Sequence, residues 1–190
     1  WHLQAWNSAT CYMMMWTTIG SIILVTNTII WHDSLANPSP TYCDISTKLN
    51  VGLSVAIPLA SLCINRRLYN IATMQAVAVT KGQVRKKRDV IIDTLIAVVV
   101  PLIFMAVHYT MQGHRYDIIE NYGCWPTTYN TAPAYVLVFA PPIAVCCISL
   151  IYCVLSLRAF IQRRAEFNEL LRSTATGLNS TRYLRLMILA

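Results

Sequence analysis

Seven cysteines carry the clearest chemistry in this sequence, and they fall into two groups. Five lie inside long apolar stretches, where a thiol packs as a small apolar side chain: Cys11, Cys63, Cys146, Cys147 and Cys153. Cys43 and Cys124 lie outside those stretches, in segments that the charge pattern described below places in an oxidising compartment, where disulfides form and persist. We expect a disulfide between these two cysteines, and the alternative is two free thiols at the same surface.

A stripe of polar residues follows one apolar stretch at steps of three or four residues, which places them on one face of a helix. Its members are Thr47, Asn50, Ser54, Pro58, Ser61 and Asn65. A polar face is unfavourable against lipid, so the stripe predicts hydrogen bonds between helices. Its outer part is also suited to line a ligand cavity, and both interpretations stay open.

Lys48 lies about one helical turn inside the outer boundary of the same stretch. An ionisable group within a membrane is a functional candidate by default, but Asp44 precedes Lys48 by four residues, the favourable order for a salt bridge on a helix. The sequence does not decide between a local salt bridge and a ligand contact. The expected ligand contacts at this end are Asp44, Thr47, Lys48, Asn50, Trp125 and Tyr129.

Motifs for catalysis do not occur in the sequence: it contains no HExxH, GxSxG, P-loop, GxGxxG or CxxC spacing. We therefore expect no enzyme activity, catalytic residue, cofactor, metal or nucleic-acid partner. Asp93 lies beside Asp89 and a basic run, and we expect an interfacial carboxylate rather than a proton carrier. A lone histidine such as His108 predicts a packing or hydrogen-bonding group.

Membrane-spanning helices are the elements that must position these residues. Of the 190 residues, 56% are hydrophobic and only 12% charged, against about 25% charged in soluble domains. This composition excludes a soluble fold and a disordered chain, and about 20 apolar residues suffice to cross a bilayer. The sequence predicts an all-α bundle, one transmembrane domain over 1–190, with spans near 9–31, 45–64, 91–109 and 133–157 and the start of another at 183–190.

Positive charge is concentrated in two loops of this bundle. Residues 65–88 carry seven Lys and Arg and no acid, and residues 158–185 carry six Arg against two Glu. The positive-inside rule then places the loops 65–90 and 158–182 in the cytoplasm. Loops 32–44 and 110–132 follow on the outer side. Prolines inside the spans, at 58, 101, 141 and 142, predict irregular helices.

Six strings, in order along the chain, resemble the a-factor-type fungal pheromone receptors, which are class D G-protein-coupled receptors with seven spans. They are WHLQAWN (1–7), CDISTKLNVG (43–52), IPLASLCINRRLYNIA (57–72), GCWPTTYNT (123–131), LRAFIQRRAEFNELL (157–171) and LNSTRYLRLMILA (178–190). Tyr42 departs from the tryptophan expected before the Cys-Asp pair, and an aromatic ring is kept. The chain begins with Trp1 and ends inside an apolar run, so we expect an internal fragment holding the second to fifth spans and the start of the sixth.

The resemblance implies a receptor in the plasma membrane that binds a prenylated peptide pheromone outside and activates a heterotrimeric G protein inside. The basic loops suit both anionic membrane lipids and the G protein. The residues expected to face the G protein are Arg66, Arg67, Arg158, Arg163 and Arg164. A transporter or channel is the alternative, and it predicts paired ionisable groups near the membrane midplane. A membrane-bound lipid-modifying enzyme is a weaker alternative, because it needs a cluster of His, Asp or Cys at one interface.

Overall fold

The computed structural model describes residues 8–73 and 82–173, and it places the side chains of residues 8–70 and 87–161. The predicted span at 183–190 lies outside the described residues. The helices are α1 (Ser8–Ile30), α2 (Pro40–Thr73), α3 (Gly82–Thr94), η1 (Leu95–Val99), α4 (Val100–Thr110), α5 (Ala132–Ala134), η2 (Tyr135–Phe139) and α6 (Ala140–Ser173). The strands are β1 (Asp117–Ile119) and β2 (Gly123–Trp125).

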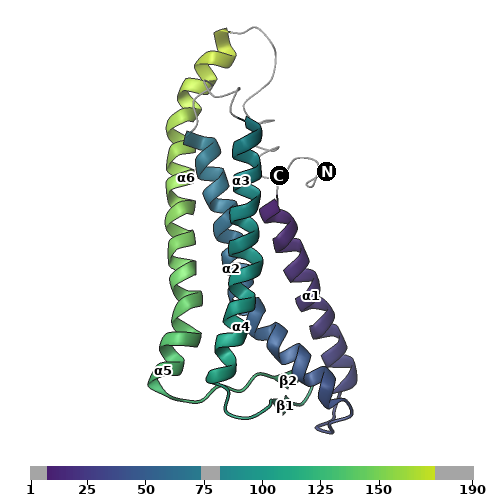
Figure 1. Cartoon of the computed structure of the whole chain (residues 1–190). Coiled ribbons are helices and arrows are strands. Elements are labelled where there is room, and N and C mark those ends of the chain that lie inside the picture. The colour runs from purple at the N-terminus through teal and green to yellow at the C-terminus, as the bar shows by residue number, and fades with distance from the viewer. Residues whose placement is uncertain (1–7, 74–81, 174–190) are drawn as a thin grey trace.

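Four helical segments are long and apolar enough to cross a membrane (Figure 1): Ser8–Ile30, Pro40–Asn70, Lys87–Thr110 and Ala132–Ile161. The third is the continuous run α3–η1–α4, and the fourth is the run α5–η2–α6. The predicted fold class, an all-α bundle, is confirmed. The short antiparallel hairpin β1–β2 was not expected from the sequence.

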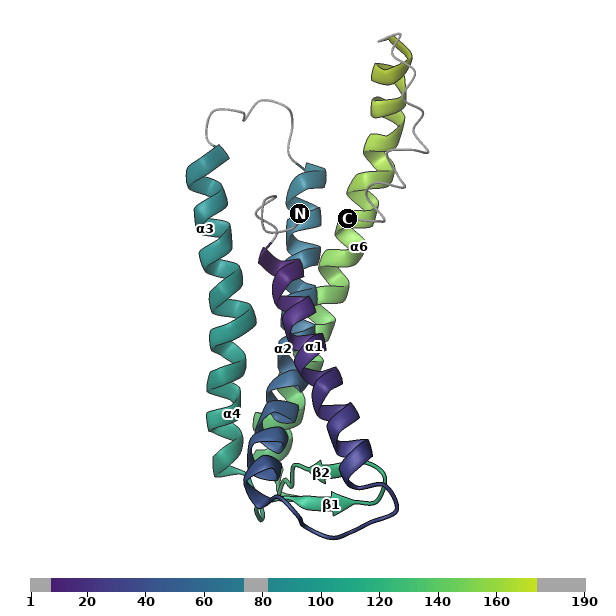
Figure 2. The ribbon, with the colours of Figure 1, turned by 90° about the vertical axis from the view of Figure 1, so that its right-hand side faces the viewer.

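Helix α2 is the centre of the bundle, since it contacts α1, α4 and α6, and Figure 2 shows it between the α3–α4 run and α6. One apolar cluster joins α2 to α1 through Trp16, Ile23 and Leu53. A second cluster joins α2 to α4 through Val55, Leu59 and Phe104. We name the two ends of the bundle by what they carry: the hairpin end holds β1 and β2, and the arginine end holds Arg66 and Arg67.

One residue separates each π-helical turn from the proline that follows it. Residue 101 is proline, which has no N–H to donate to the carbonyl four residues back and whose ring crowds that carbonyl. The preceding turn, η1, therefore widens to bonds that span five residues, as shown by the Val100 N–H that donates to the Leu95 carbonyl. Pro141 and Pro142 follow η2 in the same way.

The carbonyl left without its usual donor by Pro101 is that of Ala97, and it is bonded from another helix. The indole N–H of Trp16 on α1 donates to the Ala97 oxygen at 2.8 Å, in a buried position. The carbonyl that the proline leaves free in one helix thus accepts a hydrogen bond from the neighbouring helix α1.

The hairpin end is crossed by β1 and β2, which pair with Ile118 opposite Cys124 and lie over the ends of α1 and α2 (Figure 2). Gly123 has φ +85°, and a Cβ there would lie 2.8 Å from the Cβ of Asn27 on α1. Only glycine fits this position, because the backbone is left-handed and the approach to α1 is close. The Asn121 N–H also donates to the carbonyl of Trp31, the residue that follows α1, at 2.9 Å, so the hairpin is attached at the end of this helix.

Candidate functional site

A disulfide fastens the hairpin to the start of α2. The structure joins Cys43 to Cys124, with Cα atoms 5.3 Å apart and a sequence separation of 81 residues. Both cysteines are fully buried against Trp31, whose ring stacks on Tyr42 with centroids 6.1 Å apart. Because Cys124 lies in β2, the bond holds the loop 111–131 across the end of the bundle.

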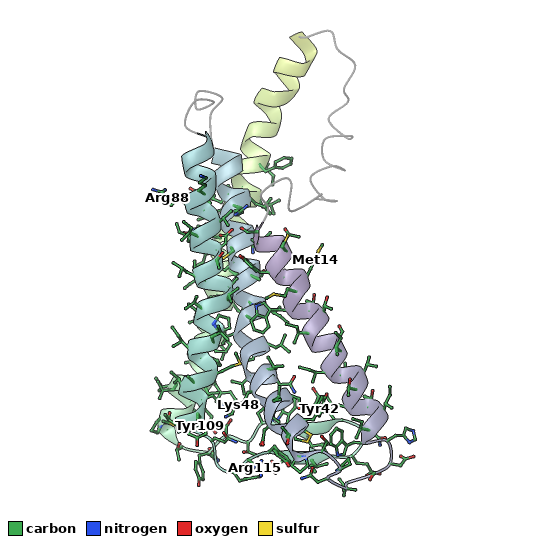
Figure 3. All side chains as sticks on the ribbon, turned by 45° about the vertical axis from the view of Figure 1, so that its right-hand side comes forward. Met14, Tyr42, Lys48, Arg88, Tyr109 and Arg115 are labelled. Carbon is green, nitrogen blue, oxygen red and sulfur yellow. A yellow bond between two sulfur atoms is a disulfide. The ribbon has the colours of Figure 1, made fainter. Side chains whose placement is uncertain are left out.

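Two polar contacts from the same end of α2 reinforce this attachment (Figure 3). Asp44 accepts two hydrogen bonds from Arg115, one of them from Nε at 3.1 Å. Hydrogen bonding to this carboxylate raises the pKa of Arg115 above its usual value. Lys48 donates to the side-chain oxygen of Gln112 and lies over the ring of Tyr109, 5.1 Å from its centroid.

These contacts give Asp44 and Lys48 partners that the sequence did not predict. The carboxylate of Asp44 forms its ion pair with Arg115, which is 71 residues away, rather than with Lys48. Gln112, the partner of Lys48, in turn donates to the backbone carbonyls of His114 and Arg115. Asp44 and Lys48 therefore hold the loop in place.

A cavity of about 870 Å³ lies beneath this loop, between α2, α4 and the η2–α6 run. Its apolar wall comes from Val51, Pro126, Val138, Phe139, Pro142 and Ile143. The backbone of Gly113 also lines it, and the polar or aromatic side chains on the wall are Asn50, Ser54, His108, His114, Asp117, Trp125, Thr127, Thr128, Tyr129 and Asn130. A mostly apolar concavity with a few polar groups is typical of a small-ligand or lipid site.

The hydroxyl hydrogens on the wall are largely bonded to the protein itself. Ser54 donates to the Val51 carbonyl at 2.7 Å, and Thr127 donates to the His114 carbonyl at 2.5 Å. Thr128 lies 3.0 Å from Nε2 of His108. His114 and Asp117, both exposed, pair at 2.6 Å at the edge of the cavity.

The predicted polar stripe of α2 divides along its length. Asn50 and Ser54 line the cavity, whereas Asn65 donates to the side-chain oxygen of Ser149 on α6 at 2.9 Å. Thr47 is buried and donates to the Cys43 carbonyl of its own helix at 2.7 Å. Each of the two interpretations of the stripe thus describes a different part of it.

Among the predicted ligand contacts, Asn50, Trp125 and Tyr129 lie on the cavity wall, while Asp44, Thr47 and Lys48 do not. Sequence reasoning missed Gln112 and Arg115 as partners of α2, because no local spacing links them to it. It also gave His108 no part in the site. The signal for His108 was its place one residue before the end of the span predicted at 91–109.

A buried ion cluster occupies the arginine end. Asp93 is fully buried and accepts hydrogen bonds from Arg66 at 3.1 Å and from the Ser8 hydroxyl at 2.9 Å. Arg66 bonds to Oδ1, whereas Arg67 lies 2.5 Å from Oδ2, the oxygen that also accepts from Ser8. Asp93 was expected to be an interfacial carboxylate rather than a proton carrier. The structure adds that it faces inward and joins α3 to α1 and α2.

The arginines expected to face a partner differ in their surroundings. The Arg66 and Arg67 side chains are 23% and 19% exposed, since they turn toward Asp93. Arg158 on α6 is exposed. Arg163 and Arg164 lie in α6, and their side chains fall outside the described residues. Within the part of the chain that the structure describes, no group of three or more His, Cys, Asp or Glu is placed to hold a metal ion.

Four helices that are long and apolar enough to cross a membrane, with a cavity between three of them beneath a disulfide-anchored loop, are the arrangement of a multi-pass membrane protein. The chain belongs to the STE3 family of pheromone A receptors, which it matches over residues 1–190. The resemblance noted in the sequence is thereby confirmed. This is a family of receptors with seven helices and not a family of enzymes.

Similar proteins occur in several fungi. The Pheromone B alpha 3 receptor of Schizophyllum commune is 46% identical over 190 residues, which cover all of this chain and 30% of that protein. Pheromone receptor 1 of Mycosarcoma maydis is 35% identical over 189 residues, covering 52% of that protein. The Pheromone a factor receptor of Saccharomyces cerevisiae is 25% identical over 191 residues, covering 99% of this chain and 40% of that protein.

The chain thus spans about a third of the length of the Schizophyllum relatives that it matches. No solved structure matches it.

Proposed function

We propose that the chain is the ligand-binding part of a plasma-membrane receptor that binds a prenylated peptide pheromone outside the cell and activates a heterotrimeric G protein inside it. The observation that carries the proposal is the cavity beneath the disulfide-anchored loop, in a chain that belongs to a pheromone receptor family. Its apolar wall suits an isoprenoid chain, for which each buried CH₂ contributes about 0.8 kcal/mol.

The hairpin end faces outward in this proposal. Support comes from charge: residues 65–88 and 158–185 hold the whole positive excess of the chain, their described parts lie at the arginine end, and cytoplasmic loops carry such an excess. The cavity then opens toward the outside and the adjoining leaflet, where a lipid-modified peptide arrives.

Two groups of residues serve the ligand in different ways. Asn50, Trp125 and Tyr129 contact it directly, because they line the cavity. Asp44, Thr47 and Lys48 act through the loop and the start of α2, which they position, so their substitution weakens binding indirectly.

Inside the cell, the exposed Arg158 and the adjoining Arg163 and Arg164 offer positive charge to an acidic face of the G protein, and to anionic lipid. Arg66 and Arg67 contribute in a different way. They are held by Asp93, so they reach a partner only when the helices at the arginine end separate.

The test uses the full-length receptor in a yeast strain that lacks its own pheromone receptors and carries a mating-pathway reporter. Cells are exposed to a panel of synthetic peptides, each made with and without an S-farnesyl group. A response that requires the farnesyl group is the expected result. Equal responses to both forms of a peptide, or silence from receptor confirmed at the cell surface, would contradict the proposal, and transport assays would then follow.

A further inference from the structure

A carboxylate lies on the wall of the cavity, at its edge. Among the described residues that line the cavity, Asp117 is acidic, and the others are apolar, aromatic, hydroxyl, amide or imidazole groups. The side chain of Asp117 is 56% exposed, so a group that enters the cavity can reach it. Its Oδ1 bonds to Nε2 of His114 at 2.6 Å, and within the described part of the chain its Oδ2 has no partner.

The cations at the hairpin end are bound to other groups. Arg115 donates two hydrogen bonds to Asp44 and lies over the ring of Tyr116, 5.9 Å from its centroid. Lys48 donates to Gln112. An uncharged imidazole such as that of the histidine partner donates one hydrogen bond and leaves the negative charge of the carboxylate in place. The edge of the cavity therefore carries a negative charge that no Lys or Arg among the described residues neutralises.

An aromatic ring lies beside this carboxylate. Asp117 in β1 is paired directly with Trp125 in β2. Directly paired residues of antiparallel strands place their side chains on the same face, with Cβ atoms about 4.5–5.5 Å apart, and both residues line the cavity. Tyr122 packs against the indole of Trp125 with ring centroids 5.1 Å apart. A carboxylate next to an indole is suited to bind a cation, because it offers an ion pair and the ring offers a cation–π contact.

The other acceptors on the wall are uncharged, and some are already bonded within the protein. The side-chain oxygen of Asn130 accepts from the Tyr135 hydroxyl at 2.8 Å. Asn50 offers an amide. A hydrogen bond between ionised groups is about twice as strong as one between neutral groups. A positive charge on the ligand is therefore recognised at Asp117 rather than elsewhere on the wall.

We propose that Asp117 and Trp125 form a subsite for a basic side chain of the ligand, while the apolar wall from η2 and α6 takes the attached hydrocarbon chain. The inference rests on the proposed function, which supplies a lipid-modified peptide as the ligand class. It adds a determinant of specificity: a lysine or arginine within a few residues of the lipid-bearing cysteine.

Three substitutions separate this subsite from a general effect of charge. Asp117→Asn removes the charge and keeps a side-chain oxygen for His114. Trp125→Leu removes the ring and keeps an apolar side chain. Glu120→Gln is the matched control, because it removes the same charge from the turn between β1 and β2, at an exposed position outside the lining of the cavity.

The probes are N-acetylated glycine peptides that end in S-farnesyl-cysteine amide and carry one lysine, placed one, two or three residues before the cysteine. Each has a neutral counterpart with Nε-acetyl-lysine at the same place. Binding to the full-length receptor in phosphatidylcholine nanodiscs is measured by equilibrium dialysis at pH 8, where the imidazole of His114 carries no charge. Thermal unfolding of each variant reports folding.

At one or more spacings, we expect the lysine peptide to bind wild-type receptor about fivefold more tightly than its neutral counterpart, as a partly exposed ion pair with a cation–π contact allows. This ratio should fall below twofold in Asp117→Asn and to about twofold in Trp125→Leu. It should stay at about fivefold in Glu120→Gln.

Equal affinities of the charged and neutral peptides at every spacing would overturn the subsite and leave the proposed function standing. An unchanged ratio in Asp117→Asn or in Trp125→Leu would do the same, as would an equal fall in Glu120→Gln. Absence of binding of every peptide to the wild-type receptor would overturn the ligand class, and with it both proposals.

Discussion

At the scale of single residues, Asp93 shows how a carboxylate is kept inside an apolar bundle. Its charge is matched by two guanidinium groups and one hydroxyl, which come from α2 and α1. Removing one partner of a buried ion pair is strongly destabilising, because the remaining charges are then buried without an opposite charge.

Substituting Asp93→Asn should therefore destabilise the receptor, by about 2 kcal/mol, below the usual range for a buried pair because the two arginines are partly exposed. Thermal unfolding of the full-length protein measures this effect. Asp89→Asn, one helical turn earlier and half-buried, is the matched control and should change little. Equal unfolding temperatures for the two variants would show that the cluster does not hold the helices together.

The sequence predicted individual residue roles only where the partners are close in the chain or share a compartment. The structure brings Cys43 and Cys124 together as expected. The pair could be predicted because only these two of the seven cysteines lie in segments that the charge pattern places outside the cell. The arginine partners of Asp93 lie 26 and 27 residues away and Ser8 lies 85 residues away, and Arg115 lies 71 residues from Asp44. Such pairs depend on how helices rotate against one another, which helical spacing within one segment does not specify.

At the scale of helices, the prolines predicted that the helices are irregular, but they did not predict that the irregularity takes the form of π-helical turns. The widened turn η1 and the bond from Trp16 to the Ala97 carbonyl are two consequences of the missing N–H at residue 101. The sequence indicated the position of the kink. It did not indicate that a tryptophan from α1 would bond the carbonyl left free there.

This coupling predicts a non-additive pair of substitutions. Trp16→Phe leaves the buried Ala97 carbonyl unpaired and should cost about 1–3 kcal/mol. In a Pro101→Ala background the same change should cost about 1 kcal/mol less, because residue 101 then supplies the N–H. Thermal unfolding of the two single variants and the double variant gives the comparison, and strictly additive effects would rule out the shared carbonyl.

The covering loop gives a second prediction at this scale. Replacing both Cys43 and Cys124 with serine opens a closed loop with a sequence separation of 81 residues and should lower stability by about 4 kcal/mol on the chain-entropy account. Cys146→Ser, at an exposed free thiol, should have little effect.

Mass spectrometry of peptides from the non-reduced wild-type protein gives an independent check of the same bond. A peptide that contains both Cys43 and Cys124 is expected. Recovery of the two cysteines as free thiols would contradict the attachment of the loop.

At the scale of the whole molecule, large apolar side chains are exposed on the outer faces of the helices, where contact with water is unfavourable. Helix α6 exposes Ile143, Leu150, Ile151 and Val154, and α1 exposes Ile22, Val25 and Ile29. Lipid, or further helices of a receptor with seven spans, covers such faces. The all-α class and four candidate spans follow from composition alone, whereas the hairpin in the loop 111–131 does not, since its strands are only three residues long.

The central claim is that the cavity under the hairpin holds the lipid part of the pheromone, and photo-crosslinking tests it most directly. A synthetic cysteine peptide carrying a benzophenone-containing prenyl group is irradiated on the full-length receptor, and the crosslinked residues are mapped by mass spectrometry. We predict crosslinks on the cavity wall, at Val138, Phe139 or Ile143, that excess farnesylated peptide abolishes. Crosslinks confined to the exposed face of α1, at Ile22 or Ile29, and insensitive to competition would contradict the account.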